Sequence, residues 1–503
     1  MAAFKQWSAV VLAASATNLM LSIAPATAAV QSGPDEASKS SGEDDALEIY
    51  FRQLNGRDFE AALKTAEGLR RNAALREFHP YLDAMRGAAL LGLERLPESA
   101  AAFRTAREAD PKDWGIELLR FESGIMTRQE TVALEALDRL IAIAPDEVRE
   151  LNEELVYYFL RNKELGTEKE RDDRRIALAR LGFGGRQISG DYLASSAIDV
   201  LIERRDFDAA TDLLRYVDDP EIIRGMLVQK RYSSLWPQLE NMAGDRLERV
   251  RASSVASAEH AYAENPSDDY LQNLANAYRH ASRSNDAIAL ESKLPATPAQ
   301  MAAMTEEMGW AFNHVALAYS DLQKIDQADS VFARLNNASL EKARWRVSMI
   351  INRLEVLVQE GRYEQAARLL DATWKSAEDD GSPYARQLVR RLRYCTMIGL
   401  GRTEEAESGF QEMMQHAEDA RHATIDGLLC GGKDAEAEDL ILANVDKEDF
   451  QKDFILSLQP QPMSSSDPSK WEKQWRRLRD RPSIAASYER IGRDLPARFL
   501  IRD

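Results

Sequence analysis

Between Ala46 and Leu458 one pattern of small and apolar positions returns again and again. A small residue is followed four positions later by a large apolar residue, on a helix that begins just after a short polar turn. Because positions i and i+4 lie on the same helix face, both side chains of such a pair point toward the same neighbour. The pattern occurs at Ser99/Phe103, Ala133/Leu137, Ala210/Leu214, Ala328/Phe332, Ala366/Leu370, Ala406/Phe410 and Ala437/Ile441.

The spacing of this pattern indicates a structural repeat. Ala62 and Ala287 carry the small residue without a large apolar residue four positions later. From Ala62 to Ala437, successive small residues are 37, 34, 77, 77, 41, 38, 40 and 31 positions apart. We interpret each step of 77 as two steps in which one unit has lost its signature. The period then lies near the roughly 34 residues of helix-pair repeats.

Three of the units also show a preceding helix. A small residue stands 12 positions before the second one at Gly87/Ser99, Ala275/Ala287 and Ala316/Ala328. Two antiparallel helices joined by a tight turn approach closely only where both contribute small side chains. Such a pair cannot bury its apolar face alone, so pairs must stack. The sequence therefore predicts an all-α fold: an α-solenoid, or superhelix, of stacked antiparallel helix pairs.

Several segments carry a family resemblance. The run Asn273–Tyr278 (Asn-Leu-Ala-Asn-Ala-Tyr) resembles the first helix of a tetratricopeptide repeat (TPR), and Gly361–Ala366 and Gly401–Ala406 resemble its turn and second helix. Gly87–Pro111 matches most of one unit. The resemblance implies a TPR protein with degenerate repeats, of an exported bacterial type. Two stretches, 146–191 and 219–266, are helical by pattern but lack the signature.

The N-terminal part is typical of a signal peptide. Lys5 precedes a mostly apolar run from Trp7 to Ile23, and Ala26-Thr27-Ala28 supplies small residues for cleavage. A membrane anchor is the alternative, but serine, threonine and asparagine interrupt the run. We therefore expect a signal peptide over 1–28, a disordered acidic leader over 29–45 and the TPR-like α-solenoid over 46–458. Export implies a periplasmic protein, or a secreted one in a cell without an outer membrane, with no stable membrane insertion.

The C-terminal part has a different composition. Residues 459–470 are rich in proline and serine and are interpreted as a linker. Residues 471–503 contain nine basic and five acidic residues, with Trp471, Trp475 and Leu478 on one helix face. We expect basic C-terminal helices that fold back and cap the solenoid. The alternative is a docking arm for an acidic surface or an anionic lipid.

Charge narrows the class of partner. The chain of 503 residues has 83 acidic and 65 basic residues and a formal net charge of −18. Such a charge disfavours nucleic acid and favours neutral or cationic partners, although solubility alone also explains it. The two cysteines, Cys395 and Cys430, fall on helices of neighbouring units. Packed helix axes lie farther apart than bridged cysteines do, so buried free thiols are preferred to a disulfide.

The sequence contains no motif for catalysis, for a cofactor or for a metal site. Glu407-Ser408-Gly409-Phe410 matches the Glu-Ser-x-Phe around the catalytic acid of lytic transglycosylases, some of which have helical superhelices. Acidic neighbours surround this segment, and Phe410 is already explained by the repeat. We expect no enzymatic activity, no cofactor and no bound metal.

A binding groove is the better hypothesis. In TPR solenoids the first helices line the concave face, which takes an extended peptide or a partner helix. Amide side chains can pair with a bound backbone, and a partly exposed tryptophan can anchor it. An ordinary solvated helix face is the alternative. The candidate partner-binding residues are Gln272, Asn273, Asn276, Arg279, Trp310, Asn313 and Leu317.

Three functions follow from these observations. The first is a non-catalytic scaffold that holds a protein or peptide in the concave groove. The second is an accessory part of an envelope or polysaccharide-export assembly, whose acidic body binds a cationic polymer. The third, and least favoured, is a superhelical enzyme such as a lytic transglycosylase, which needs inward-facing acids in one apolar pocket.

Overall fold

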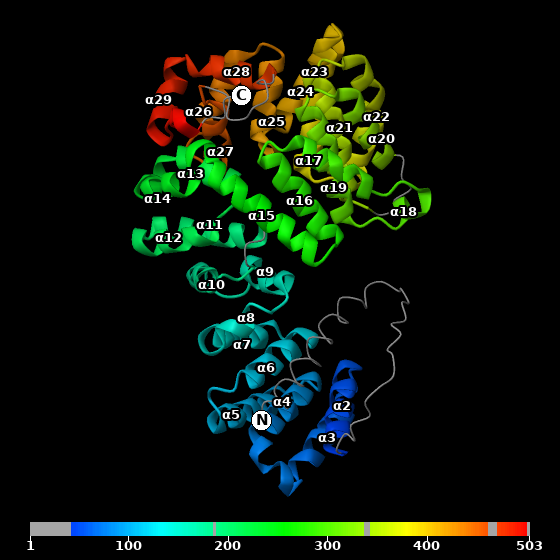
Figure 1. Ribbon diagram of the computed structural model, residues 1–503, viewed down its shortest axis with the longest axis vertical. Coiled ribbons are helices and arrows are strands. Elements are labelled where there is room, and N and C mark those ends of the chain that lie inside the picture. The colour runs from blue at the N-terminus through cyan, green and yellow to red at the C-terminus, as the bar shows by residue number, and fades with distance from the viewer. Residues whose placement is uncertain (1–41, 185–187, 337–342, 461–469, 500–503) are drawn as a thin grey trace. The chain divides into compact units, whose positions relative to one another are not determined.

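The computed structural model describes residues 42–184, 188–336, 343–460 and 470–499 (Figure 1). Within these ranges every regular element is a helix, and the one β-bridge joins Gln229 to Gly492. The chain divides into two compact units, one ending at Gly185 and the other beginning at Arg186. The prediction of an all-α, TPR-like array of helix pairs is confirmed, and we describe each unit by itself.

The first unit is an array in which most helices contact their sequence neighbours, while α4 also contacts α6 and α7 also contacts α10. Its helices are α2 (Gly42–Asn55), α3 (Phe59–Arg70), η1 (Ala73–Phe78), α4 (His79–Gly92), α5 (Leu96–Ala109), α6 (Trp114–Met126), α7 (Glu130–Ile143), α8 (Pro145–Val148), α9 (Glu153–Arg161) and α10 (Glu168–Leu181).

The second unit begins with an irregular stretch and continues with longer, regular helix pairs. The irregular stretch comprises α11 (Ile188–Glu203), α12 (Phe207–Leu213), η2 (Leu214–Tyr216), α13 (Pro220–Val228), η3 (Lys230–Leu235), α14 (Trp236–Ala243), η4 (Asp245–Leu247) and α15 (Glu248–Glu264). The regular pairs comprise α16 (Asp268–His280), α17 (Ser284–Ala289), η5 (Leu290–Lys293), α18 (Pro298–Ala302), α19 (Glu306–Asp321), α20 (Ile325–Asn336), α21 (Arg346–Gln359), α22 (Tyr363–Asp380), α23 (Pro383–Gly399) and α24 (Thr403–Gln415). The unit ends with η6 (Ala417–Asp419), α25 (Arg421–Cys430), α26 (Asp434–Asn444), α27 (Glu448–Ser457), α28 (Lys470–Arg479), α29 (Pro482–Ile491) and η7 (Ala497–Phe499).

One turn geometry recurs in both units and explains the repeat signature. Five positions before each of the nine small residues, the backbone turns left-handed, with φ between +57° and +71°. The next residue then donates its N–H to the carbonyl five positions earlier, at 2.7–3.0 Å, which closes the first helix. The nine left-handed residues are Arg57, Glu94, Arg128, Arg205, Ser282, Gln323, Gly361, Gly401 and Gly432.

Two further glycines with positive φ bear on the long intervals of 77 residues. Gly166 lies between α9 and α10, and Gly244 lies between α14 and η4. Each falls near the middle of one interval, where the sequence places a repeat without its signature. Helix turns are therefore present in both stretches, although their geometry departs from the other nine.

Close packing within a pair follows the prediction from small residues. A Cβ atom added at Gly87 of α4 would lie 2.9 Å from the ring of Phe103 on α5, nearer than real Cβ contacts. The hydroxyl of Ser99 on α5 donates to the carbonyl of Gly87 at 2.8 Å. The glycine thus lets the phenyl ring sit against the helix backbone, and the serine is satisfied without any distant partner.

The second unit closes on itself. A closed path of helix contacts runs from α13 through α15, α16, α19, α21, α23 and α25 to α27, and α27 contacts α13 again. Lys452 of α27 lies against Gly225 of α13, and Arg231 of η3 forms an ion pair with Glu448 of α27. Figure 1 shows α27 beside α13. The array in this unit is therefore a ring of helix pairs and not an open solenoid.

The C-terminal helices seal this ring. We call residues 470–499 the C-terminal clasp. At one end, the indole of Trp475 donates to Asp426 of α25 at 2.7 Å. At the other end, Arg493 donates to Leu227 O at 2.6 Å and to Glu240 at 2.9 Å. The side chains of Trp475 and Leu478 are buried, as the predicted apolar stripe requires, whereas the side chain of Trp471 lies outside the described part.

The boundaries of the parts differ from those expected. Helix α2 begins at Gly42, inside the predicted acidic leader, because its apolar residues Leu47, Tyr50 and Phe51 pack into the first core. Gln459, placed in the predicted linker, is 2% exposed and its amide bonds the clasp. The predicted signal peptide over 1–28 and most of the linker lie outside the described residues.

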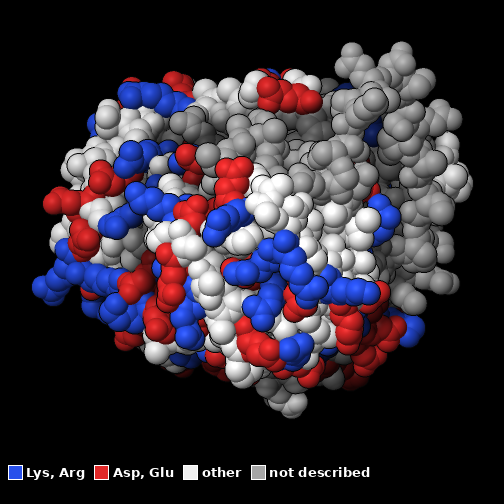
Figure 2. All heavy atoms as spheres, turned by 90° about the horizontal axis from the view of Figure 1, so that it is seen from below, with Lys and Arg blue, Asp and Glu red and all other residues white. Residues whose placement is uncertain are grey.

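Two surface observations complete the fold. On the face drawn in Figure 2, basic and acidic side chains are interspersed, so the net charge of −18 forms no single-sign field there. In the described part of the chain, no helix combines the length and the apolar character that a membrane crossing demands.

Candidate functional site

Two of the predicted site residues line a cavity of about 70 Å³. Asn273 and Asn276 lie on α16, and across the cavity Ser254 and Ser257 lie on α15. The side chain of Ser267 accepts a hydrogen bond from the N–H of Tyr270 and so caps the start of α16. This start determines the helix face on which Asn273 and Asn276 lie. The cavity thus lies at the seam between the irregular stretch and the first regular repeat of the second unit.

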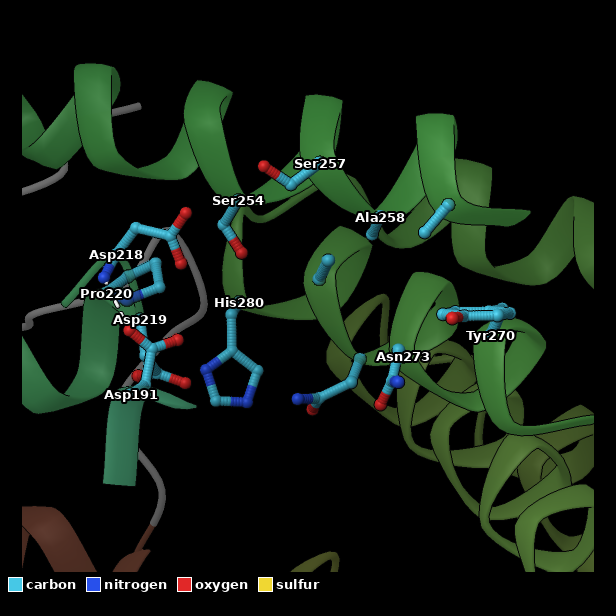
Figure 3. A pocket seen from close by; sticks show the side chains of 13 residues that line it. Asp191, Asp218, Asp219, Pro220, Ser254, Ser257, Ala258, Tyr270, Asn273 and His280 are labelled. Atoms are coloured by element: carbon cyan, nitrogen blue, oxygen red, sulfur yellow. Dashed lines mark hydrogen bonds between the residues drawn. The ribbon is translucent and has the colours of Figure 1, made fainter. Parts of the chain in front are cut away.

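Three aspartates form the opposite wall. Asp191 comes from α11, while Asp218 and Asp219 precede α13. The backbone N–H of Asp218 donates to the Asp191 carboxylate at 2.6 Å, and Asp219 caps α13 by accepting from Glu221 and Ile222 at 2.7 and 2.9 Å. In Figure 3 the imidazole of His280 lies between this acidic group and Asn273.

Burial sets the charge states here. Asp191 is 3% exposed, and this burial, with the nearby negative charge of Asp218, raises the pKa of its carboxyl to about 8. Burial also lowers the pKa of His280, against the opposing effect of Glu221. At neutral pH the cavity therefore holds a protonated Asp191 and a neutral imidazole, and a cation entering it would favour ionisation of Asp191.

Four polar side chains at this seam are available to a ligand. Ser254, Ser257, Asn273 and Asn276 are all half-buried, and none of them bonds to another side chain or backbone group that the structure describes. The seam therefore offers donors and acceptors that the fold itself does not use.

The other five predicted residues lie elsewhere. Gln272 is half-buried on α16 but outside the cavity lining. The guanidinium of Arg279 bonds Asp321 of α19 at 3.0 Å. On α19, the indole N–H of Trp310 donates to Glu306 at 3.3 Å, and Leu317 packs against the apolar core of this region.

Asn313 differs most from its prediction. It is 2% exposed, and its side-chain oxygen accepts from Asn352 of α21 at 2.8 Å. The cause is that adjacent first helices bring positions about one repeat apart into contact. The same geometry joins Arg279 to Asp321. These side chains therefore connect one repeat to the next and do not face a groove.

Sequence reasoning missed the acidic wall and His280. Asp191, Asp218 and Asp219 lie in or beside the two stretches without the signature, so no register was available to place them. Asp218-Asp219-Pro220 nevertheless carries a local signal, because Asp followed by Pro begins a helix. That signal indicates a helix start with a carboxylate at its tip, although it says nothing about Asp191.

The chemistry weighed from sequence is not assembled by the fold. Glu407 lies on an exposed face of α24. Cys395 and Cys430 are buried free thiols. No group of three His, Cys, Asp or Glu side chains that could hold a metal ion exists among the described residues.

No protein-family model matches the chain, and no curated protein matches it. Similar solved structures include yeast Tom70, at 12% identity and a TM-score of 0.28, covering 89% of this chain and 100% of that one. Another is Naa15/Naa10 bound to HypK-THB, at 13% identity and a TM-score of 0.24, covering 90% and 79%. A third is the TPR domain of P58(IPK), at 12% identity and a TM-score of 0.17, covering 79% and 98%. At these scores the similarities add nothing to what the helices themselves establish.

Proposed function

We propose that this protein is a non-catalytic scaffold that holds an extended peptide or a partner helix at the seam of α15 and α16. The observation that carries the proposal is the set of four uncommitted polar groups, Ser254, Ser257, Asn273 and Asn276. A side-chain amide can bind a peptide backbone because it has N–H donors and a carbonyl acceptor. A hydroxyl can do the same because its one O–H group both donates and accepts. The small cavity between them suits a single side chain of the partner.

A capture experiment tests the proposal. The full chain is immobilised and exposed to an envelope extract, beside an Asn273→Ala/Asn276→Ala variant and a control, Gln411→Ala, which removes an exposed amide on α24. We expect one partner to be retained by the wild type and the control and reduced at least about tenfold for the double variant. Equal capture by all three proteins, with unchanged circular dichroism, would show that the partner does not bind at the α15–α16 seam.

The acidic wall supports a second candidate, the binding of a cationic polymer. Asp191, Asp218 and Asp219 present carboxyl groups to the cavity, and attraction to a cation in it weakens as salt screens the charges. Calorimetry with chitosan oligomers at low and high salt tests this function. Salt-sensitive binding that an Asp218→Asn variant loses supports it, whereas the absence of binding at low salt excludes it.

We do not propose catalysis. Glu407, the residue matched to a transglycosylase acid, is on an exposed helix face and not in the apolar pocket that a catalytic acid of this kind needs.

We propose that the protein acts after export to the periplasm, on the basis of the residues from Lys5 to Ala28. Expression of the full chain in a cell with two membranes, followed by fractionation and N-terminal sequencing, tests this location. We expect the mature chain to begin at Ala29 in the periplasmic fraction. An uncleaved chain in the cytoplasm would contradict the proposal.

A further inference from the structure

A buried arginine on α15 has no partner. Arg251 is 9% exposed, yet it forms no hydrogen bond and no ion pair with any residue that the structure describes, and its Nε atom is buried without an acceptor. Among its donors, Nε is the one that is buried without an acceptor, and burying a donor unpaired costs free energy. Folded chains keep such a group only where something else repays that cost.

The neighbouring charges do not compensate Arg251. Burial lowers the pKa of this guanidinium to about 10, with a further contribution from Arg224 on α13. The carboxylate that favours the charged form is Glu221, but Glu221 is already hydrogen-bonded to Arg224. His280 reaches the other oxygen of the same Glu221, at 3.8 Å. Arg251 therefore remains charged at neutral pH, and the carboxylate that favours its charge is also in contact with Arg224 and His280.

Arg251 lines a cavity of about 490 Å³ between α15 and the turn that follows α16. The lining combines four charged residues with small and apolar ones, and Ser282 is its one hydroxyl. Arg283 also lines it but is committed to Asp286 at 2.6 Å and to Glu259 at 3.3 Å. The apolar part of the wall consists of Ala252, Val255, Ala256 and Ala281.

Two exposed carboxylates in the lining restrict the charge of a ligand. Glu248 and Glu259 both line the cavity, and both are exposed. One negative charge on the ligand neutralises Arg251, whereas further negative charges would be repelled by these two glutamates. The lining therefore disfavours phosphates and other multiply charged anions and favours a single carboxylate attached to an apolar body.

We propose that this cavity binds an aliphatic carboxylate, with the carboxylate on Arg251 and the hydrocarbon against Val255 and the alanines. A guanidinium and a carboxylate match as two parallel N–H···O bonds, which gives this pairing its specificity. The carboxylate can belong to a small acid or to an acidic side chain of a protein, since both present the same group. This site does not depend on the α15–α16 seam proposed above.

Calorimetry with the full chain tests the site. The probes are hexanoate, the matched cation hexylammonium, inorganic phosphate and a blocked peptide, acetyl-Ala-Leu-Glu-Leu-Ala-amide. We expect saturable binding of hexanoate, of the peptide or of both, and none of hexylammonium or phosphate. Binding of hexanoate assigns the site to a small acid, and binding of the peptide alone assigns it to an acidic side chain of a protein.

Variants connect binding to Arg251. We expect Arg251→Met to weaken binding about 10- to 100-fold, because the charged hydrogen bonds are lost. Ala252→Glu, at an exposed position on the same wall, should block binding while folding normally. Arg249→Gln removes the same charge outside the cavity and should leave binding unchanged. Absence of binding by either carboxylate, or equal binding by wild type, Arg251→Met and Ala252→Glu, would overturn the proposal.

Discussion

Arg391 on α23 and Arg251 on α15 are both buried in the second unit, at 4% and 9% exposed. Arg391 bonds Asp426 of α25 at 3.1 Å and also bonds Glu355 of α21, whereas Arg251 bonds nothing that the structure describes. Glu355, Arg391 and Asp426 are 36 and 35 residues apart, so they occupy corresponding places in successive repeats. Regular stacking therefore supplies partners, and the loss of repeat register around α13–α15 leaves a polar group open to a ligand.

The largest expected effect comes from replacing each arginine by methionine. Arg391→Met leaves Glu355 and Asp426 without their shared cation, and breaking a buried pair costs about 3–5 kcal/mol. Arg251→Met removes an uncompensated charge, so we expect no loss of stability. Thermal and urea unfolding of the two variants measure the difference. A similar loss of stability in both variants would mean that Arg251 has a structural partner, and the proposed difference between the two arginines would be wrong.

The second effect concerns the clasp, which joins the regular and irregular regions. Glu240 of α14 accepts from Arg493 at 2.9 Å and also from Arg498. Glu240→Gln removes the charge that holds both, and we expect a loss of about 1–3 kcal/mol. Hydrogen exchange should rise in α29, η7 and α14 together. Asp371→Asn, on an exposed side chain of α22, is the control and should change neither quantity. Faster exchange in α29 alone would show that α14 does not depend on the clasp.

A third, smaller effect depends on pH and distinguishes the acidic wall from the regular repeats. The folded pKa of Asp191, about 8, lies above its unfolded value, so the folded state binds the extra proton. Stability from this group is therefore lost as pH rises from about 4 to about 8, and the penalty stays constant above that. Asp191→Asn can still accept from Asp218 N–H, and we expect it to stabilise the protein at pH 8, where the wild type carries the penalty.

Unfolding of Asp191→Asn and wild type across this pH range measures that effect. The gain should shrink toward pH 4, where both states of the wild type are protonated. Asp138→Asn in the first unit, where the carboxylate bonds Arg174 at 2.6 Å, should instead destabilise at neutral pH. A gain for Asp191→Asn that is the same at all pH values would contradict the assignment of a raised pKa.

The smallest effect belongs to the cysteines of the regular region. Cys395 on α23 and Cys430 on α25 are free and buried, and burial raises the pKa of the Cys395 thiol well above its usual range. Thiolates are the reactive form, so a thiol reagent should modify neither residue until the protein unfolds. A reductant should leave the melting temperature unchanged. A melting temperature that falls with reductant would indicate a bridge in this region.

The fold was predictable where local residue types decide it. The pair of Gly87 and Ser99 predicts close helices, and the structure has the phenyl ring of Phe103 against that glycine. The left-handed turns were not predictable residue by residue, because six of the nine carry Arg, Glu, Ser or Gln. Tertiary packing holds those residues in a conformation that costs them about 1–2 kcal/mol.

The candidate site was predictable only in part. Asn273 and Asn276 were found because their repeat is well formed, but Asn313 was placed on a groove because a single helix does not reveal pairing with the next repeat. Arg251 carries a signal that sequence analysis can use. It stands four positions before Val255 and one after Val250, both buried, so the helix period places a charge beside an apolar face. Which charged side chains lie near Arg251 depends on how the helix pairs of the second unit close into a ring. No local pattern in the sequence reveals that closure.

The contact of α27 with α13 has a consequence for how this protein can change. In an open stack, a helix pair can be added or deleted at little cost because each pair touches only its neighbours. Here the rotation accumulated from α13 to α27 must return the last pair to the first. One pair more or fewer would misplace Lys452 from Gly225 and Arg493 from Glu240 together. The copy number of repeats in the second unit is therefore fixed by geometry.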